Sequence, residues 1–390
     1  MPSDASSIKK ILNSKYTAIA ILLIISIGVY LNTLPNEFVY DDKAQVLNNP
    51  WIKDIGYISK IFLSNVWAFE GEDETSNYYR PFMHIIYMVD YHIFGLKPWG
   101  FHLTNIIFHA GVTLLVFMIA SMLINQSLNL NSKFIPNKSG QNSKSNSQLL
   151  TLNSKLLSPA FIAALLFAAH PIHTEAVAWV GGIPDLSFTL FYLFSFYFYI
   201  NSNKRYTPLN PLSRGENKNK RGGKQIILSA IFFFLATLCK EPALTLPLLM
   251  LVYDYSISRN SLYSSRFTVR SIIKRYFPYL IVSIIYFTLR TYALGGFAPQ
   301  KKYTMLNSYE IFINVFPLFI KYLEKLILPI NLNVFYVFHP ISSILQWKGL
   351  IALIFTLGFI FLVYIFRRHK VVFLSLLWIV IPLLPVLYIP

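Results

Sequence analysis

The sequence predicts an all-α, polytopic membrane protein with about nine transmembrane helices. Its 390 residues are 55% hydrophobic and only 13% charged, with a mean hydropathy of +0.49. Soluble domains carry about 25% charged residues, so this composition rules out a disordered chain and argues against a water-soluble enzyme. The single cysteine, Cys239, excludes an intramolecular disulfide and a cysteine-based zinc site.

Each predicted span is an apolar run of about 20 residues, which is the length that crosses a hydrocarbon core. The first run, 16–36, contains no charged residue and is interpreted as an uncleaved anchor rather than a signal peptide. Lys240 and Glu241 divide two later runs that are short for two crossings, so one tilted span is the alternative there. The other eight spans are expected at 100–124, 158–174, 185–201, 223–240, 242–257, 276–294, 349–366 and 371–389.

The loops between these spans alternate in charge. Five segments hold 22 of the 34 Lys and Arg residues and only two of the 17 acids, and they are 1–15, 125–157, 202–224, 256–276 and 367–370. The positive-inside rule therefore predicts a cytoplasmic N-terminus. Residues 126–154 and 202–224 are expected to be flexible cytoplasmic loops. Basic loops beside an anionic leaflet account for the net charge of +17, so no nucleic-acid partner is expected.

The first outer loop, 37–97, is long and acidic, with eight acids and four basic residues between Glu37 and Arg80. Apolar residues recur at near-helical spacing from Ile55 to Trp67, which predicts a helix lying in the membrane interface. A second helix is expected to begin at Pro81 and to end by Gly95. Such a loop can lie flat on the bilayer and cover a cavity that opens to lipid.

Ionisable and polar side chains cluster at the outer ends of the predicted spans. Taken singly, each has an equally good structural role, such as a solvated acid pair, a neutral Lys–Glu pair or a packing histidine. Charged groups at this depth are costly unless they are paired or hydrated, so their gathering on one side indicates a functional site. The candidates are Asp41, Asp42, Arg80, His102, His170, His173, Glu175, Asp185, Lys240, Glu241 and Arg290.

The order of the motifs around these candidates resembles a known family. The motifs are Tyr40-Asp41-Asp42, Tyr79-Arg80-Pro81, the string from His170 to Trp179 (His-Pro-Ile-His-Thr-Glu-Ala-Val-Ala-Trp), Lys240-Glu241 and Tyr253-Asp254. Over about 16–390 they resemble the membrane-embedded glycosyltransferases of the GT-C fold. The most similar branch is the transmembrane and tetratricopeptide-repeat O-mannosyltransferases with their prokaryotic relatives. Ile183 stands where those proteins usually have a basic residue, and the 390 residues contain no tetratricopeptide repeat.

The resemblance implies one membrane-embedded domain over 1–390 that transfers a sugar, such as mannose, from a polyprenyl- or dolichyl-phosphate. The acceptor would be a hydroxyl of a protein or glycan at the outer face of the membrane. Asp41 would be the general base, with Asp42 either orienting the acceptor or replacing Asp41. Three cations would bind the departing phosphate, with Glu241 holding one of them, Lys240, in place; they are Arg80, Lys240 and Arg290.

The remaining candidates have two alternative roles under this resemblance. These residues would line the acceptor side, and they are His102, His170, His173, Glu175 and Asp185. Alternatively, His170, His173 and Glu175 would hold a divalent metal ion. No other cofactor is expected. The membrane would be the cell membrane of a prokaryote or the endoplasmic reticulum of a eukaryote. The rival interpretations are a transporter or lipid flippase, a non-catalytic scaffold, and a transferase that uses a different donor to modify lipid A or cell-wall glycan.

Overall fold

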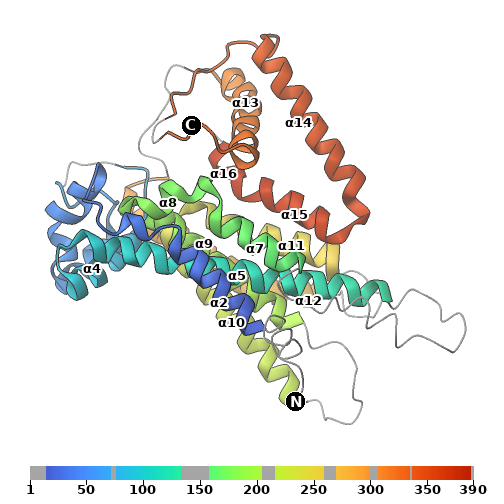
Figure 1. Cartoon of the computed structure of the whole chain (residues 1–390), viewed down its shortest axis with the longest axis horizontal. Helices are drawn as coiled ribbons and strands as arrows, with labels where there is room; N and C mark the ends of the chain where they lie inside the picture. Colours follow the sequence, from blue (N-terminus) through green and yellow to red (C-terminus); the bar gives the residue numbers. More distant parts are fainter. Residues whose placement is uncertain are drawn as a thin grey trace, which may run out of the picture.

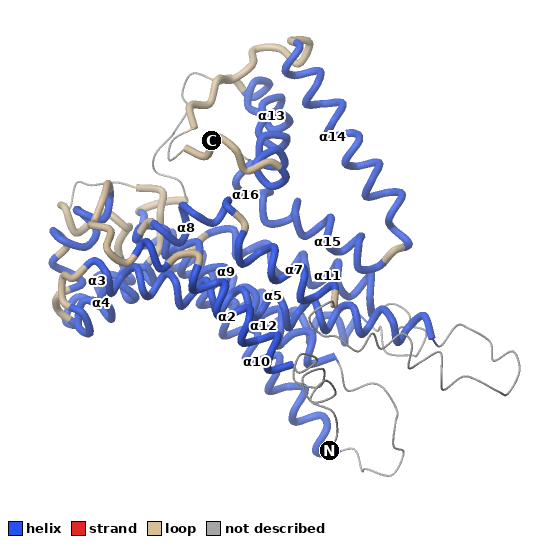
Figure 2. Tube along the Cα trace, in the orientation of Figure 1, coloured by secondary structure: helices blue, strands red, loops and turns tan. Residues whose placement is uncertain are grey.

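The computed structural model describes residues 15–71, 76–132, 158–203, 216–258, 269–297, 306–333 and 336–387. Within these ranges the regular structure is entirely helical, as Figure 2 shows, and this confirms the predicted all-α class. The long helices of the first two thirds of the chain lie alongside one another, while α13, α14 and α15 lie to one side of them (Figure 1).

The helical elements have the following bounds. The α-helices are α2 (Lys15–Gly28), α3 (Ile58–Leu63), α4 (Pro81–Phe94), α5 (Pro98–Ser132), α7 (Pro159–Ala169), α8 (Thr174–Ala178), α9 (Ile183–Asn203), α10 (Glu216–Cys239), α11 (Leu246–Tyr253), α12 (Val269–Leu294), α13 (Ser308–Ile327), α14 (Trp347–Ile365), α15 (Lys370–Val380) and α16 (Leu384–Leu387). Short 3₁₀ or π-helical turns are η1 (Leu31–Thr33), η2 (Lys43–Asn48), η3 (Pro50–Ile52), η4 (Ile55–Tyr57), η6 (Pro171–His173), η7 (Val180–Gly182), η9 (Glu241–Thr245), η10 (Asp254–Ser258), η12 (Phe366–Arg368) and η13 (Ile381–Leu383).

The described residues contain seven helices that are long and apolar enough to cross a membrane, or eight if one bent pair is a single span. The protein is therefore a multi-pass membrane protein, with seven or eight candidate spans among the described residues where about nine were predicted. The bent pair is Pro159–Ala169 with Pro171–Ala178, which turn by 46°. The seven are Lys15–Thr33, Pro98–Leu128, Val180–Ser202, Gly222–Cys239, Ile273–Leu294, Trp347–Arg368 and Lys370–Leu387.

Besides 158–174, which forms the bent pair, the predicted span 242–257 does not form a helix of spanning length. Instead, η9, α11 and η10 follow one another without a break, because Pro242 and Pro247 interrupt regular α-helical hydrogen bonding. The segment nevertheless runs along the length of α9. It starts beside Asp185, which binds Lys240, and it ends where Asp254 accepts a hydrogen bond from Tyr199 at 2.6 Å.

The centre of the bundle is the contact between α9 and α10. Ser195 on α9 and Ser229 on α10 each donate a hydrogen bond to the other's backbone carbonyl at 2.7 Å. Tyr279 on α12 then donates to the Ser229 hydroxyl at 2.6 Å. Small hydroxyl residues let two backbones approach closely in a membrane, and each such interhelical bond adds roughly 1 kcal/mol. These contacts fix the relative positions of the three helices whose ends carry Asp185, Lys240 and Arg290.

The first loop forms its own apolar core against α4, α5 and η7, around Ile52, Tyr87 and Val180. Helix α4 matches the prediction, with Pro81 in its first turn and Gly95 after its last residue at a φ of +66°, which L-residues rarely adopt. The predicted 55–67 helix is shorter than expected, because it consists of η4 and α3 and ends at Leu63. Whether this loop lies on the bilayer stays a prediction.

Two further differences concern polar segments. Helix α5 continues to Ser132 and α10 begins at Glu216, so the ends of both predicted flexible loops are helical. The rest of those loops, 133–154 and 204–215, lies outside the described residues. The sequence prediction also missed α13, which begins at a capping box between Asn307 and Glu310.

Candidate active site

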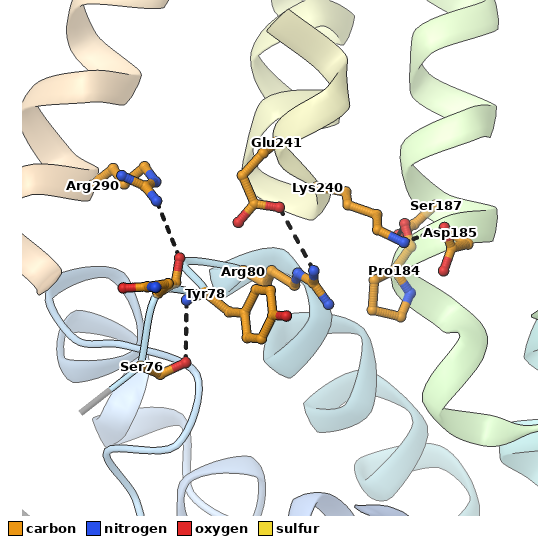
Figure 3. Close-up of polar contacts among 10 residues, drawn as sticks. Ser76, Tyr78, Arg80, Pro184, Asp185, Ser187, Lys240, Glu241 and Arg290 are labelled. Atoms are coloured by element: carbon orange, nitrogen blue, oxygen red, sulfur yellow. Dashed lines mark hydrogen bonds and ion pairs between the residues drawn. The ribbon is translucent and has the colours of Figure 1, made fainter. Parts of the chain in front are cut away.

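Four helix ends meet at the end of the bundle that is nearest the first loop, here called the loop end. They are the start of α4, the start of α9, the end of α10 and the end of α12, which carry Arg80, Asp185, Lys240 and Arg290. Figure 3 shows these side chains on one side of the helix ends, with Glu241 between two of the cations. Residues more than 200 positions apart are joined directly, since Arg290 Nη2 donates to the Asn77 carbonyl at 3.1 Å.

Asp42 is buried and fastens the first loop to the turn before α9. Its Oδ2 accepts from the Val39 backbone N–H at 3.1 Å, and its Oδ1 accepts from the Gly181 N–H at 2.8 Å. Burial raises the pKa of Asp42 to about 6, although both N–H groups lower it, and the neighbouring charge of Asp41 raises it further. With both oxygens occupied, Asp42 is suited to hold the loop in place rather than to take a proton from an acceptor.

Asp41 has the opposite environment. Its side chain is exposed, and no hydrogen bond or ion pair joins it to another residue in the described part of the chain. The preceding residue, Tyr40, has a φ of +49°, a left-handed conformation that costs an L-residue roughly 1–2 kcal/mol. This strained turn points two adjacent carboxylates in different directions, one into the protein and one away from it.

Lys240 and Glu241 do not pair with each other, which corrects the expectation that Glu241 holds Lys240. Lys240 Nζ instead donates to Asp185 Oδ1 at 2.5 Å, and Glu241 Oε2 lies 3.6 Å from Arg80 Nη2 (Figure 3). The extended backbone of Lys240 separates α10 from η9 and sends these neighbouring side chains to different partners. Each of the two cations therefore faces a carboxylate that is itself only partly buried.

Arg290 is 9% exposed and uses its guanidinium on backbone carbonyls. Besides Asn77, it donates to the carbonyl of Phe297, and its guanidinium lies 5.5 Å from the Phe297 ring centroid. These contacts fix the segment that leads from the first loop into Arg80. In this arrangement Arg290 positions the loop, and its predicted contact with a phosphate stays a prediction.

The histidines occupy different surroundings. His170 Nδ1 accepts from the Ile172 N–H at 3.2 Å and so caps the turn η6, whereas His173 packs on Phe167 with ring centroids 4.3 Å apart. His102 is buried in the second turn of α5. In the described residues no group of three His, Cys, Asp or Glu side chains is arranged to hold a metal ion. The binding of a divalent ion stays a prediction. The Glu175 side chain is exposed and lies near Asp185 and Lys240.

The turn 179–182 connects the acidic loop to the cations, and several of its contacts were not foreseen. Asn105 Nδ2 donates to the Trp179 carbonyl at 2.7 Å, and Tyr87 donates to the Val180 carbonyl at 3.2 Å. Gly182 is required here, since a Cβ would lie 2.4 Å from the Ala176 carbonyl oxygen. Ile183, at the predicted basic position, is buried in the core of the first loop. Tyr87 was missed because its helical position predicts only packing.

The fold and this site define a class: a multi-pass, all-helical membrane protein in which acids and cations from distant segments meet at one end of the bundle. Comparison with known proteins identifies sequences that are similar to this chain. The chain is 28% identical over 248 residues to protein O-mannosyl-transferase TMTC3 of Homo sapiens, which is 63% of this chain and 22% of the relative. It is 28% identical over 236 residues to human TMTC4, covering 59% of this chain and 28% of the relative.

A relative from Drosophila melanogaster, protein O-mannosyl-transferase Tmtc3, is 30% identical over 229 residues, covering 58% of this chain and 22% of the relative. These matches confirm the resemblance to the transmembrane and tetratricopeptide-repeat O-mannosyltransferases. The chain spans only about a quarter of the length of the curated relatives it matches. No protein-family model matches the chain. No solved structure matches it.

Proposed function

We propose that this protein is a glycosyltransferase that moves a sugar from a polyprenyl- or dolichyl-phosphate carrier to a hydroxyl of a protein or glycan. The transfer takes place at the outer face of the membrane, beneath the first loop. Mannose is the first sugar to test, because the relatives are named protein O-mannosyl-transferases.

The observation that supports the proposal is a series of contacts that links the turn carrying Asp41 to two cation–carboxylate pairs at one end of a membrane bundle. Asp41 is exposed and free of partners among the described residues, while Asp42 anchors the same turn to η7. Asp185 follows η7 by three residues and binds Lys240, next to the Arg80–Glu241 pair. This chain of contacts links the turn that carries Asp41 to the helix end that carries Lys240.

The reaction assigned to these residues is a substitution at the anomeric carbon. The acceptor hydroxyl transfers its proton to Asp41 while its oxygen bonds to the anomeric carbon. The bond between that carbon and the phosphate oxygen breaks, and the bonding electrons leave with the lipid phosphate. Asp42 does not take the proton in this scheme, since its two oxygens already accept hydrogen bonds from backbone N–H groups.

Arg80 and Lys240 stabilise the negative charge that develops on the leaving phosphate. Their side chains are 20% and 24% exposed, so a phosphate can reach them from the open side. The carboxylates of Glu241 and Asp185 occupy positions where phosphate oxygens would give the same cations a partner. Fixed cations in a partly buried site lower the barrier more than they would in water.

The proposal is tested by incubating the purified protein with polyprenyl-phosphate sugars, including the mannosyl form, together with acceptor peptides and glycans. Consumption of the lipid-linked sugar and labelling of an acceptor would support it, with Asp41→Asn as the inactive control. A parallel reaction with chelator tests the predicted divalent ion. In sealed vesicles, movement of intact lipid-linked sugar across the bilayer without consumption would instead support the flippase alternative and contradict catalysis.

A further inference from the structure

Among the described residues, the buried polar atoms without a hydrogen-bond partner include three at the loop end. They are Arg80 Nε, Glu241 Oε1 and the Tyr286 hydroxyl. Buried polar groups in folded proteins are nearly always hydrogen-bonded, so unpartnered groups that lie together call for an explanation. Tyr286 stands out because its side chain is fully buried, at 0% exposure, although it carries a hydroxyl that donates to nothing.

Tyr286 packs beside the two segments that carry Arg80 and Glu241. It precedes Arg290 by one helical turn on α12, so the two side chains share a face. Its ring contacts that of Tyr79, the residue before Arg80, with centroids 6.0 Å apart. It also belongs to one apolar cluster with Leu238, which lies three residues before Glu241. The charged side chains near enough to act electrostatically on the Tyr286 hydroxyl include those of Glu241, Arg290 and Arg80.

The Arg80–Glu241 pair is loose compared with its neighbour. Arg80 Nη2 and Glu241 Oε2 are 3.6 Å apart, which is beyond hydrogen-bonding distance, whereas Lys240 and Asp185 are 2.5 Å apart. The side chains of Arg80 and Glu241 are also 20% and 25% exposed on their open side. An anion that approaches from that side can therefore displace Glu241 as the partner of Arg80 with a small loss of interaction free energy.

We infer that Glu241 alternates between two partners: Arg80 when the site is empty, and the Tyr286 hydroxyl when Arg80 binds the donor phosphate. Without Tyr286, the released carboxylate would be left partly buried with no hydrogen bond, and phosphate binding would be opposed by that loss. Tyr286 is thus a positioning residue that acts through Glu241. This inference rests on the proposed function, because it takes the anion to be the phosphate of a polyprenyl-phosphate donor.

Burial favours this indirect role over direct contact between Tyr286 and the phosphate. The Tyr286 side chain has no exposed surface and is packed among Tyr79, Leu238 and Leu294. A phosphate would have to enter that cluster to reach the hydroxyl. Glu241 has one buried oxygen and a partly exposed side chain, so it needs only to turn.

The test is a double-mutant cycle for the binding of polyprenyl phosphate to the full-length protein in detergent or nanodiscs. Tyr286→Phe should weaken binding by roughly tenfold, because the released Glu241 loses its hydrogen bond. In the Glu241→Ala background, Tyr286→Phe should have no further effect, because no carboxylate remains to be held. A tenfold loss that persists in that background would overturn the inference in favour of direct contact.

Tyr279→Phe is the matched control, since it removes a buried hydroxyl from the same helix. Tyr279 is 1% exposed and its hydroxyl donates to Ser229, about two helical turns from Tyr286. Binding of polyprenyl phosphate by this variant should equal that of the wild type. Its thermal stability should fall, whereas that of the empty Tyr286→Phe protein should not, because the Tyr286 hydroxyl has no partner to lose. A marked fall in the melting temperature of Tyr286→Phe would contradict the inference.

The outcomes separate this inference from the proposed function. Equal binding by wild type and Tyr286→Phe overturns the alternation while leaving sugar transfer intact. If Tyr286→Phe weakens binding only when Glu241 is present, and the wild-type protein transfers no sugar, the alternation is supported and the proposed enzymatic activity is contradicted. Absence of polyprenyl phosphate binding by the wild-type protein overturns both.

Discussion

The Asp42 carboxylate accepts a hydrogen bond from the Gly181 backbone N–H at 2.8 Å, across 139 positions of the chain. This contact joins the acidic first loop to the turn that leads into α9. It also distinguishes two adjacent acids that have the same chemistry, because Asp42 is tied down and Asp41 is exposed. The contact therefore gives each aspartate a separate expected phenotype.

Asp41→Asn should abolish sugar transfer while leaving the melting temperature unchanged, because the carboxylate makes no contact that an amide would lose. The expected fall in kcat is at least about 100-fold, the usual contribution of a general base. Single-turnover measurements with a lipid-phosphate sugar would show it. Near-normal turnover would remove Asp41 as the base.

Asp42→Asn should instead destabilise the protein, since an amide has one acceptor oxygen for the two N–H groups of Val39 and Gly181. The expected loss is about 1–3 kcal/mol of local stability. Hydrogen exchange of the Gly181 amide, compared between Asp42→Asn and Asp41→Asn, measures it. Equal protection in both variants would contradict the anchoring role.

Asp90 should make the stability of the first loop depend on pH. Burial raises the pKa of Asp90 from 3.8 to about 7, against a hydrogen bond from Thr104 that lowers it. Near neutral pH the folded protein therefore holds a proton on Asp90 that the unfolded chain releases. The contribution of protonated Asp90 to folding stability is complete below about pH 4 and is lost as the pH rises through about 7. Melting temperatures from pH 5 to 8 should fall less in Asp90→Asn than in the wild type, and parallel curves would contradict this.

Arg80→Ala should lower kcat/KM for the lipid-linked sugar by roughly 100-fold, because a fixed cation facing the leaving phosphate is removed. Lys240→Ala should have an effect of the same kind. Arg367→Ala is the control, since Arg367 lies beyond the end of α14 and donates to the Tyr364 carbonyl. Donor kinetics that are unchanged in the first two variants would exclude these residues as phosphate ligands.

Gln45→Leu should reduce both stability and turnover, because Gln45 holds the turn after Asp42 against α4. Its Oε1 lies 2.9 Å from His84 Nε2, and burial lowers the pKa of His84 to about 4, so the ring is neutral at pH 7 and Nε2–H donates. The buried ring would lose its partner, at about 1–3 kcal/mol. The melting temperature and kcat should fall together, and a stable, fully active variant would show that the turn does not need this bond.

Single cysteines should report the two ends of the bundle from opposite sides of the membrane. In a Cys239→Ala background, an impermeant maleimide should label Glu70→Cys from outside and Arg367→Cys only after the membrane is opened. Both native side chains are exposed, and Cys239 itself is buried. Labelling of both positions from the same side would contradict the predicted orientation.

The sequence by itself determined where most helices lie and which residues gather at one end of them. Apolar runs set the spans, because crossing a bilayer demands an uninterrupted length of apolar helix, and Pro81 and Gly95 set the bounds of α4 through backbone constraints. Arg80, Asp185 and Lys240 lie near one another in the structure (Figure 3), because helix ends on the same side of a membrane lie at the same level.

Only the tertiary structure decided which charge pairs with which. Their adjacency in the sequence predicted that Lys240 and Glu241 pair with each other. The extended backbone of Lys240 between α10 and η9 instead directs Lys240 to Asp185 and Glu241 to Arg80. The path of 241–258 through proline-interrupted turns, and the position of Tyr286 beside the segment that carries Glu241, depend on packing between α9, α10 and α12. Local sequence encodes helix length and polarity, whereas partner choice depends on distances between distant segments, which no local pattern contains.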